Sequence, residues 1–328
     1  MPPCFEPILA EVAPDRVEWR IIDHCTAVTR LYAIYEHFAH QLIVEHLSLL
    51  QTNFRFAELP PSVQVAYRSG LSKIMEKKDG PRYAEIDLAF VVNQYGLALG
   101  GKKFVLEPKA MLAHEQNLRL SELGKLFAAS GMPGIESWIS KSPSISVFFD
   151  CGDRVGGSAE AELAELIKYR NEAAHGGIVV DDVLGPETLA EFCTFMEVLC
   201  GAMADFVRHA GLACLLRSGA AEVRGTVNSC IKAGSVIVGP MVGKFAVGDT
   251  IYLFADGYAV SGDVLSIQLD DEDLALVNLE KERQLGLRLA TQGRKGCAVV
   301  ALVEMVEDRD SASDSDAALG VVEELVEC

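Results

Sequence analysis

The spacing of apolar residues divides the chain into two parts of different character. From about residue 14 to residue 211 apolar positions recur every three or four residues, the period of an amphipathic helix, and glycine and proline fall mainly between these runs. Helices are predicted at about residues 21–50, 62–77, 84–98, 119–130, 159–175 and 186–210. The polar side chains of Asn117 and Ser121 are candidate caps for the fourth of these helices. The first part of the chain is therefore expected to be a helical bundle.

Beyond Leu215 the pattern changes to short runs of valine, isoleucine and tyrosine, separated by glycine and aspartate about every ten residues. Strands are predicted at residues 222–229, 235–243, 249–254, 258–268, 273–279, 285–290 and 297–304. Such regular spacing favours a small closed β-barrel. The predicted fold class is multidomain α and β, with an all-α bundle followed by a barrel.

Three units are expected along the 328 residues: a helical domain at residues 1–215, a barrel at 216–306 and an acidic tail at 307–328. The tail opens with Glu-Asp-Arg-Asp-Ser-Ala-Ser-Asp, which is too polar to bury a core, so the sequence predicts disorder there. No apolar run approaches the ~20 residues of a membrane helix, and no basic-then-apolar leader opens the chain. We therefore expect a cytoplasmic protein without a membrane partner.

The net charge of -18 opposes nucleic-acid binding, because lysine and arginine contacts to phosphate normally dominate that affinity. The tail alone holds 8 acidic residues and 1 basic residue, whereas residues 1–215 hold 28 and 19. More than a third of the net charge thus lies in a short segment. Any RNA site must be a local basic patch on an acidic body.

No cofactor or metal is expected. The nine cysteines form no Cys-x-x-Cys pair and have no histidine at zinc-ligand spacing, so they are interpreted as ordinary thiols. Four histidines, His24, His37, His40 and His46, share the first long helix without an acidic or cysteine cluster nearby. Packed or solvated histidines are the favoured interpretation.

The chemistry concentrates in the segment Tyr-Arg-Asn-Glu-Ala-Ala-His-Gly at residues 169–176. Residues four apart share a helix face, so Asn171 lies beneath His175, and Arg170 flanks them. RNA cleavage by the ribose 2'-hydroxyl needs a base near neutral pH, an acid for the leaving oxygen and positive charge at the phosphate. One histidine and one arginine supply half of that set, and a twofold dimer would supply all of it.

A simpler interpretation stays open for the same segment. His175 stabilises the helix C-terminus through the dipole, and Arg170 and Glu172 are solvated surface charges. Spacing alone does not separate this interpretation from a catalytic one.

The octapeptide resembles the Arg-Asn-x-x-x-His signature of the HEPN superfamily, helical bundles that are often dimeric ribonucleases. Segments 30–36, 117–120 and 170–176 together resemble its MAE_28990/MAE_18760-like branch. The resemblance implies that Arg170 and His175 are catalytic and that Asn171 orients them. It further suggests that Glu36 and Tyr35 support the site from the first helix, although both are equally compatible with a helix-helix seam.

The predicted barrel has a resemblance of its own. The segments Arg-Gly-Thr-Val at 224–227, Val-Gly-Asp at 247–249 and Gly-Leu-Arg-Leu at 286–289 are similar to the second, barrel domain of EF-Tu-like translation factors. The stretch between Gly234 and Val247 is longer than in those factors. No Gly-x-x-x-x-Gly-Lys-Ser/Thr sequence occurs in the chain, so GTP hydrolysis is not implied.

The sequence thus predicts a metal-independent endoribonuclease of the toxin or anti-phage defence kind, cleaving at a composite site in a homodimer. Its expected partners are RNA, with tRNA or rRNA as candidates, and an antitoxin, phage protein or translation component that the barrel contacts. The alternative is a non-catalytic helical binding or dimerisation module with the barrel as an adaptor.

Overall fold

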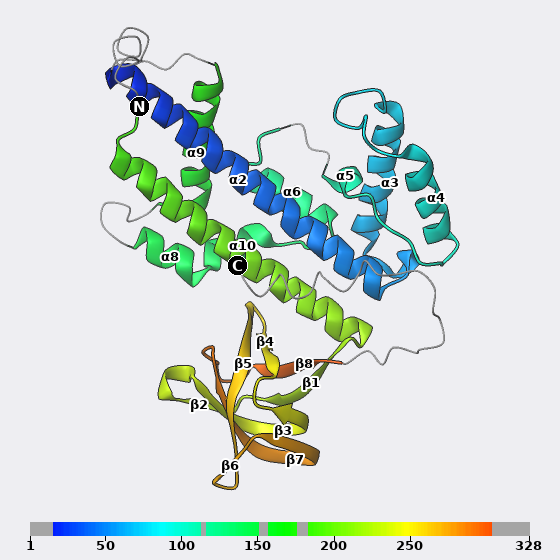
Figure 1. Cartoon of the computed structure of the whole chain (residues 1–328), viewed down its shortest axis with the longest axis vertical. Helices are drawn as coiled ribbons and strands as arrows, with labels where there is room; N and C mark the ends of the chain where they lie inside the picture. Colours follow the sequence, from blue (N-terminus) through cyan, green and yellow to red (C-terminus); the bar gives the residue numbers. More distant parts are fainter. Residues whose placement is uncertain (1–15, 113–115, 151–156, 176–182, 304–328) are drawn as a thin grey trace, which may run out of the picture.

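The computed structural model describes residues 16–112, 116–150, 157–175 and 183–303 (Figure 1). Helices occupy one end of the elongated chain and strands the other, and the long helix α10 (Pro186–Ser218) runs between the two. Two separate clusters of buried side chains form the cores, one in each part. The predicted fold class of a helical domain followed by a barrel is therefore confirmed.

Three long helices form the centre of the helical part. Helix α2 (Arg16–Asn53) packs against both α9 (Ala159–His175) and α10. The apolar stripe predicted from the sequence faces this contact, with side chains from Val28 to Leu50 buried. Burying such a stripe, rather than intrinsic helix propensity, stabilises helices of this kind.

A side lobe (residues 56–112) packs on the C-terminal half of α2 and contains the 3-10 turn η1 (Phe56–Glu58), α3 (Pro61–Glu76), α4 (Leu88–Leu99) and α5 (Pro108–Met111). The rings of Phe56, Tyr67 and Phe104 cluster in its core. A Cβ atom on Gly70 would lie 1.8 Å from the carbonyl oxygen of Ala110. Only glycine allows α3 and α5 to approach this closely.

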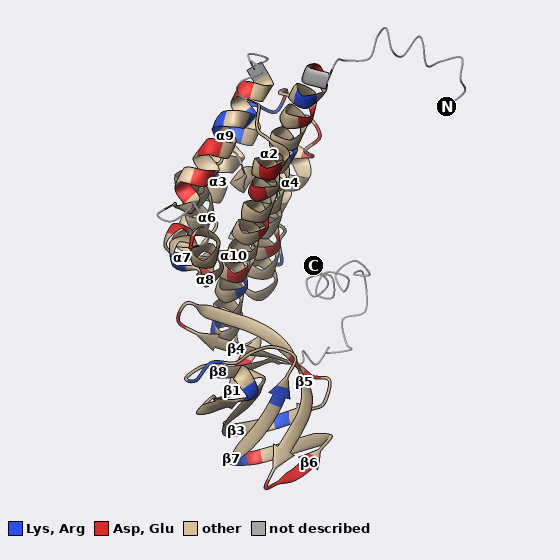
Figure 2. Cartoon of the chain, turned by 90° about the vertical axis from the view of Figure 1, so that its left-hand side faces the viewer, with Lys and Arg blue, Asp and Glu red and all other residues tan. Residues whose placement is uncertain are grey.

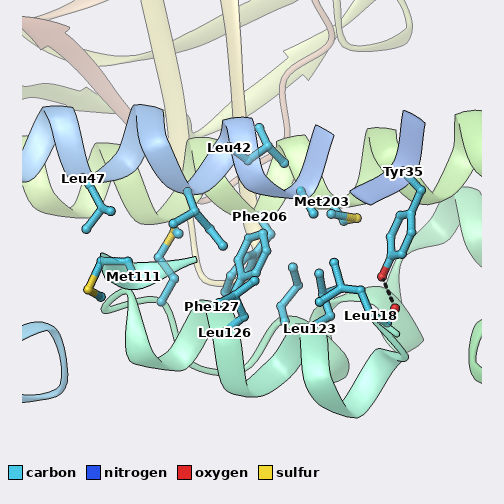
Figure 3. Packing of buried hydrophobic residues seen from close by; sticks show 14 of the residues in the cluster. Tyr35, Leu42, Leu47, Met111, Leu118, Leu123, Leu126, Phe127, Met203 and Phe206 are labelled. Atoms are coloured by element: carbon cyan, nitrogen blue, oxygen red, sulfur yellow. Dashed lines mark hydrogen bonds between the residues drawn. The ribbon is translucent and has the colours of Figure 1, made fainter. Parts of the chain in front are cut away.

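Three further helices close the bundle: α6 (Leu120–Ala129), α7 (Ile135–Lys141) and α8 (Pro143–Phe149). Figure 3 shows Leu123 and Phe127 of α6 directed toward the layer formed by α2 and α10, where Phe127 contacts the ring of Phe206. The sequence did not predict α5, α7 and α8, because helices of four to seven residues are too short to display a period.

The cap predicted for α6 is wrong. Arg119 occupies the N-cap position, and no side chain there bonds to the helix. Ser121 lies inside the first turn of α6, and Asn117 directs its side chain to α9 instead. A residue chosen as a cap from the sequence therefore has a tertiary partner.

The strands close into a barrel. They are β1 (Ala221–Thr226), β2 (Ser229–Ile231), β3 (Val236–Ala246), β4 (Thr250–Ala255), β5 (Tyr258–Leu269), β6 (Glu272–Leu274), β7 (Leu276–Leu289) and β8 (Ala298–Leu302). All pairs are antiparallel, and the ring runs β1-β8-β4-β5-β7-β3 and back to β1. The short strands β2 and β6 extend its rim.

One strand differs from the sequence prediction. Residues 273–279 and 285–290 were expected to be two strands, whereas β7 is continuous from Leu276 to Leu289. The exposed residues 280–284, Glu-Lys-Glu-Arg-Gln, interrupt the apolar alternation. Arg283 and Gln284 pair with β3, and the register of the two strands shifts across residues 280–282, so the strand continues through an irregularity that the side-chain pattern does not mark.

A cluster of rings joins α10 to the barrel. The imidazole of His209 stacks on Phe254 of β4 at 4.8 Å between centroids, and Trp138 of α7 lies 5.1 Å from the same imidazole. Nε2 of His209 is 3.1 Å from the carbonyl oxygen of Ala255. The helical part is therefore in direct contact with the barrel through α10, and Trp138 of α7 packs beside that contact.

Helix α10 is also long and apolar enough to cross a membrane, judged by length and composition alone. The core helix of a soluble protein passes the same test. Here α10 packs against α2, α7 and α8 and contacts strands β1 and β5.

Candidate active site

The guanidinium of Arg170 is held by side chains from three segments that are far apart in the sequence. Its Nη1 atom donates to the Oδ1 atoms of Asn171, at 3.1 Å, and Asn117, at 3.5 Å. Its carbon Cζ lies 5.0 Å from the centre of the Tyr32 ring. Amide oxygens and an aromatic face thus fix the position of a half-buried cation.

Asn171 connects these groups. Its Oδ1 accepts one hydrogen bond from Arg170 and another from Nδ2 of Asn117, the latter at 3.1 Å. Asn117 comes from the segment before α6, and Asn171 comes from α9. The side-chain amide of Asn171 therefore orients the guanidinium while it joins two elements of the bundle.

Two tyrosines of α2 hold the segment before α6 in place. The backbone N–H of Leu118 donates to the hydroxyl of Tyr32 at 2.8 Å, and the hydroxyl of Tyr35 donates to the Leu118 carbonyl at 2.9 Å (Figure 3). Both tyrosines and Leu118 are buried. Burial raises the pKa of Tyr32 and raises that of Tyr35 well above its usual value, so both hydroxyls stay protonated at neutral pH. Together the two hydroxyls satisfy both backbone polar groups of the buried residue Leu118.

The charge of Arg170 is not neutralised within the described part of the chain, where no carboxylate forms an ion pair with it. The neighbouring Glu172 lies 3.9 Å from the ammonium of Lys168, and Glu36 accepts a long hydrogen bond from the Tyr32 hydroxyl at 3.5 Å. Figure 2 shows basic and acidic residues together on α9. Of the five N–H donors of a guanidinium, only those on Nη1 are used by the two asparagines, which leaves donors for an anion.

His24 anchors the same region from the N-terminal half of α2. Its buried ring meets the ring of Tyr169 edge-on at 5.7 Å, and its Nδ1 accepts the backbone N–H of Leu184 at 3.2 Å. Burial lowers the pKa of His24, and the nearby Glu172 only partly offsets this. A neutral imidazole therefore ties α9 and the residues before α10 to α2.

A model of the RiboL-PSP-HEPN family matches residues 9–209, more than half of the chain. The chain belongs to the RiboL-PSP-HEPN family. The match covers every helical element named above except the end of α10. The resemblance of its short segments to the MAE-type branch of the superfamily stays a prediction.

Other comparisons add little. No curated protein matches the chain. Two solved structures of the C-terminal domain of a Geobacillus thermoleovorans protein assigned as a U32 peptidase, one of them a selenomethionine variant, are each 12% identical and cover 24% of this chain. They match over 96% and 89% of their own lengths with TM-scores of 0.22. A score this low does not establish a shared fold, and the EF-Tu-like barrel also stays a prediction.

In this HEPN family member, the predicted site residues are brought together in part. Arg170 and Asn171 bond directly, and Tyr35 and Glu36 approach them from α2 through Leu118 and Tyr32. Residue 175 is the last residue of α9, one helical turn beyond Asn171. The side chain of His175 lies outside the described residues, as does Gly176.

Sequence reasoning gave no site role to Asn117 or Tyr32. Both lie in segments that carried the family resemblance, but Asn117 was interpreted as a helix cap and Tyr32 was given no role of its own. Neither the Asn-Leu pair at residues 117–118 nor the Tyr-x-x-Tyr pattern at residues 32–35 gives a local signal of the contact between Leu118 and Tyr32, because the two segments are 86 residues apart. Among the described residues, no group of three or more His, Cys, Asp or Glu side chains is arranged to hold a metal ion.

Proposed function

We propose that this HEPN protein is a metal-independent endoribonuclease in which Arg170 binds the scissile phosphate. The observation that carries the proposal is the way this cation is held. Two amide oxygens and a tyrosine ring fix its position, and no carboxylate neutralises it in the described structure. A protein that needed Arg170 only for stability would more simply pair it with a carboxylate.

The proposed reaction is attack by the ribose 2'-oxygen on the adjacent phosphorus. A base removes the 2'-hydroxyl proton, the bond from phosphorus to the 5'-oxygen breaks, and an acid protonates that leaving oxygen. The products are a 2',3'-cyclic phosphate and a 5'-hydroxyl. Arg170 stabilises the additional negative charge on the phosphate, and His175 transfers a proton. Asn171 and Asn117 position Arg170 rather than react.

The base and the acid must be two groups, whereas residues 170–175 contain one histidine. We therefore propose that the enzyme works as a homodimer in which two copies of α9 face one RNA strand. A twofold axis brings the same patch from each subunit together, which supplies two histidines and two arginines.

The side lobe offers RNA a local positive surface despite the net charge of -18. Residues 56–112 contain 8 lysines and arginines against 6 aspartates and glutamates. Nη2 of Arg82 in this lobe donates to the carbonyl of Leu112, in the segment that leads toward Asn117. Phosphates flanking the scissile one can therefore lie on the lobe.

In the cell, we propose an effector of the toxin or phage-defence kind that cleaves tRNA or rRNA. Its regulator would be an antitoxin, a phage protein or a translation component that contacts the barrel. The second candidate is a non-catalytic module in which Arg170 binds RNA or a partner without cleaving, and the family membership is equally compatible with it.

The decisive experiment incubates the purified full chain with total RNA in EDTA and determines the ends of the products. The wild type should cleave and leave 2',3'-cyclic phosphate ends, and both Arg170→Ala and His175→Ala should abolish cleavage. Lys168→Ala is the matched control, because Lys168 is an exposed cation on the same helix. Full activity of His175→Ala, or 3'-hydroxyl products, would reject this mechanism, and binding without cleavage would favour the second candidate.

A further inference from the structure

The barrel contains a pocket of about 460 Å³ that the proposed cleavage site does not use. Tyr258 and Val260 of β5 form one wall, and residues 290–294, between β7 and β8, form the other. Pockets of this size accommodate a small organic ligand. Its chemistry is set by one tyrosine, one arginine and backbone carbonyls.

Arg294 and Tyr258 form a stacked pair in this pocket. The guanidinium carbon of Arg294 lies 4.3 Å from the centre of the Tyr258 ring. The Tyr258 hydroxyl donates to the carbonyl of Gln292 at 2.6 Å, which fixes the orientation of the ring. A planar cation over an aromatic ring presents flat surfaces of the kind on which unpaired nucleic-acid bases stack.

The backbone beside the pocket is strained. Lys232, Ala233 and Gly234 have consecutive positive φ angles of 51°, 56° and 94°, although two of them carry side chains. The N–H of Gly293 donates to the Gly234 carbonyl at 2.8 Å, so this strained turn is fastened to the pocket wall. Strain of this kind persists where the surrounding structure fixes it, and it is concentrated at ligand sites.

The turn at residues 232–234 adds positive charge beside the pocket through Lys232. Lys232, Arg294 and Lys295 are exposed, and in the described part of the chain none of them is paired with a carboxylate. Burial raises the pKa of Tyr258, the positive charge of Arg294 partly offsets that rise, and Asp205 of α10 adds to it. That aspartate is itself paired with Arg208, whose Nη1 is 2.5 Å from its Oδ1. The surroundings of the pocket therefore favour an anion.

We propose that this pocket binds an unpaired nucleotide of single-stranded RNA, with the base stacked on Tyr258 and Arg294 and the backbone phosphates near Lys232 and Lys295. The inference rests on the proposed ribonuclease function for the choice of RNA. Flat stacking surfaces select a base, and the clustered cations select a phosphodiester. Double-stranded RNA is disfavoured, because paired bases cannot leave their stack to enter a pocket.

The pocket and Arg170 are separate places on the molecule. Tyr169 contacts His24, which bonds to Leu184 just before α10, whereas the pocket lies beside Asp205 of the same helix. The helical rise from Pro186 to Asp205 puts these two regions roughly 30 Å apart. Binding at the pocket therefore holds RNA at a distance from the cleaved bond, and the two sites can be inactivated independently.

Fluorescence anisotropy tests the pocket with the full-length His175→Ala protein, in which cleavage should be abolished while Arg170 is kept. The probe is a labelled single-stranded RNA oligomer, compared with a duplex of the same sequence. Tyr258→Leu and Arg294→Gln should each weaken binding of the single strand about tenfold, whereas Tyr258→Phe, which keeps the ring, should retain it. Lys281→Gln is the matched control, because Lys281 is an exposed cation on the β7 face of the same barrel.

Unchanged affinity in Tyr258→Leu and Arg294→Gln, an equal loss in Lys281→Gln, a preference for the duplex or no binding at all would each overturn the inference. Circular dichroism of every variant separates lost binding from lost folding. The cleavage assay is independent of these outcomes. If the wild type cleaves RNA and the pocket variants bind RNA as the wild type does, the ribonuclease proposal is supported and the pocket proposal is rejected. If the wild type does not cleave RNA and the pocket variants bind more weakly, the pocket proposal is supported and the ribonuclease proposal is rejected.

Discussion

Each part of the molecule places an arginine over a tyrosine ring, but the two pairs are built differently. In the helical part, Arg170 lies over Tyr32, whose ring is buried and whose hydroxyl accepts the N–H of a buried peptide. In the barrel, Arg294 lies over Tyr258, which lines an open pocket and bonds to the carbonyl of an exposed residue. Arg170 is therefore fixed in one position, whereas Arg294 presents the flat face of its guanidinium to the pocket.

The difference shows that the burial of the tyrosine, more than the arginine–tyrosine contact itself, determines which function the contact can serve. The helical pair is fixed from α2, α9 and the segment before α6, so a small displacement of any of the three moves the cation. Catalysis requires that precision, since a charge must meet the transition state at a defined place. Stacking a base requires only a flat, accessible face.

Replacing each arginine with lysine tests this contrast most strongly. Arg170→Lys keeps the charge but loses the planar donors that meet Asn117 and Asn171, so RNA cleavage should fall about 100-fold or more. Arg294→Lys keeps a cation beside Tyr258, and RNA affinity should fall less than about tenfold. Single-turnover cleavage and anisotropy measure the two effects. Equal sensitivity of both sites would remove the distinction between them.

Two histidines of the helical part lie in different surroundings. His209 of α10, at the contact with the barrel, is stacked on Phe254 and lies within hydrogen-bonding distance of a carbonyl. His46, in the core of the helical part, is 2% exposed, and neither of its ring nitrogens has a partner. Burial, assisted by Arg217, lowers the pKa of His46 from 6.5 to about 4.

The helical part should therefore lose stability in acid through His46. The folded state binds this proton less readily than the unfolded chain, so the stabilisation is complete above about pH 6.5 and is lost as the pH falls toward 4, by about 3 kcal/mol. The lowered pKa of His24 acts in the same direction. Urea unfolding of the full chain at several pH values measures the slope.

His46→Leu is the matched variant for this measurement. It should remove most of the difference in unfolding free energy between pH 6.5 and 4, and the part due to His24 and the carboxylates should remain. A variant with the same pH slope as the wild type would contradict the assignment to His46.

The same hydroxyl deletion in both regions should give a smaller, third effect. Tyr32→Phe leaves the buried N–H of Leu118 without a partner and should lower the free energy of unfolding by about 1–3 kcal/mol. Tyr258→Phe exposes the Gln292 carbonyl to water and should cost less than about 1 kcal/mol. Denaturant unfolding followed by circular dichroism compares them. Equal costs would show that the Leu118 peptide finds another partner.

The sequence predicted the long helices, the barrel and the motif on α9, because each has a local signal. Apolar periodicity marks the stripe on α2, and alternation marks most strands. The polar run at residues 280–284 concealed the continuity of β7, because the alternation of apolar and polar side chains does not indicate how the backbone is paired. Short helices such as α5 have no period to detect.

The site was predictable only on α9. Arg170 and Asn171 are neighbours in the sequence, so their bond needs no knowledge of the fold. Asn117 and Tyr32 act only after α2, α6 and α9 have packed, and their contacts span 54 and 86 residues. The same holds for the pocket, where Tyr258 and Arg294 meet only when the barrel closes. Residues that support a site from a distance are the ones that a single sequence conceals.

The smallest expected effect concerns how RNA reaches Arg170. Lys102 and Lys103 are exposed on the side lobe and belong to its local excess of positive charge. If each contacts one phosphate of a single strand, Lys102→Gln with Lys103→Gln should flatten the dependence of log affinity on log salt by up to about 1.4, because each contact releases about 0.7 of a counterion. Affinity at physiological salt should fall less than tenfold, with cleavage at saturating RNA retained.

Anisotropy titrations over a series of salt concentrations give this slope, and the His175→Ala background prevents cleavage during the measurement while it keeps Arg170. Lys281→Gln, which removes an exposed cation from the barrel, is the control. If the slope is unchanged in the lobe variant, the RNA path does not cross Lys102 and Lys103, and the phosphates are neutralised elsewhere, by the second copy of α9 or by the barrel. The salt slope therefore distinguishes an RNA path over the side lobe from a path that avoids it.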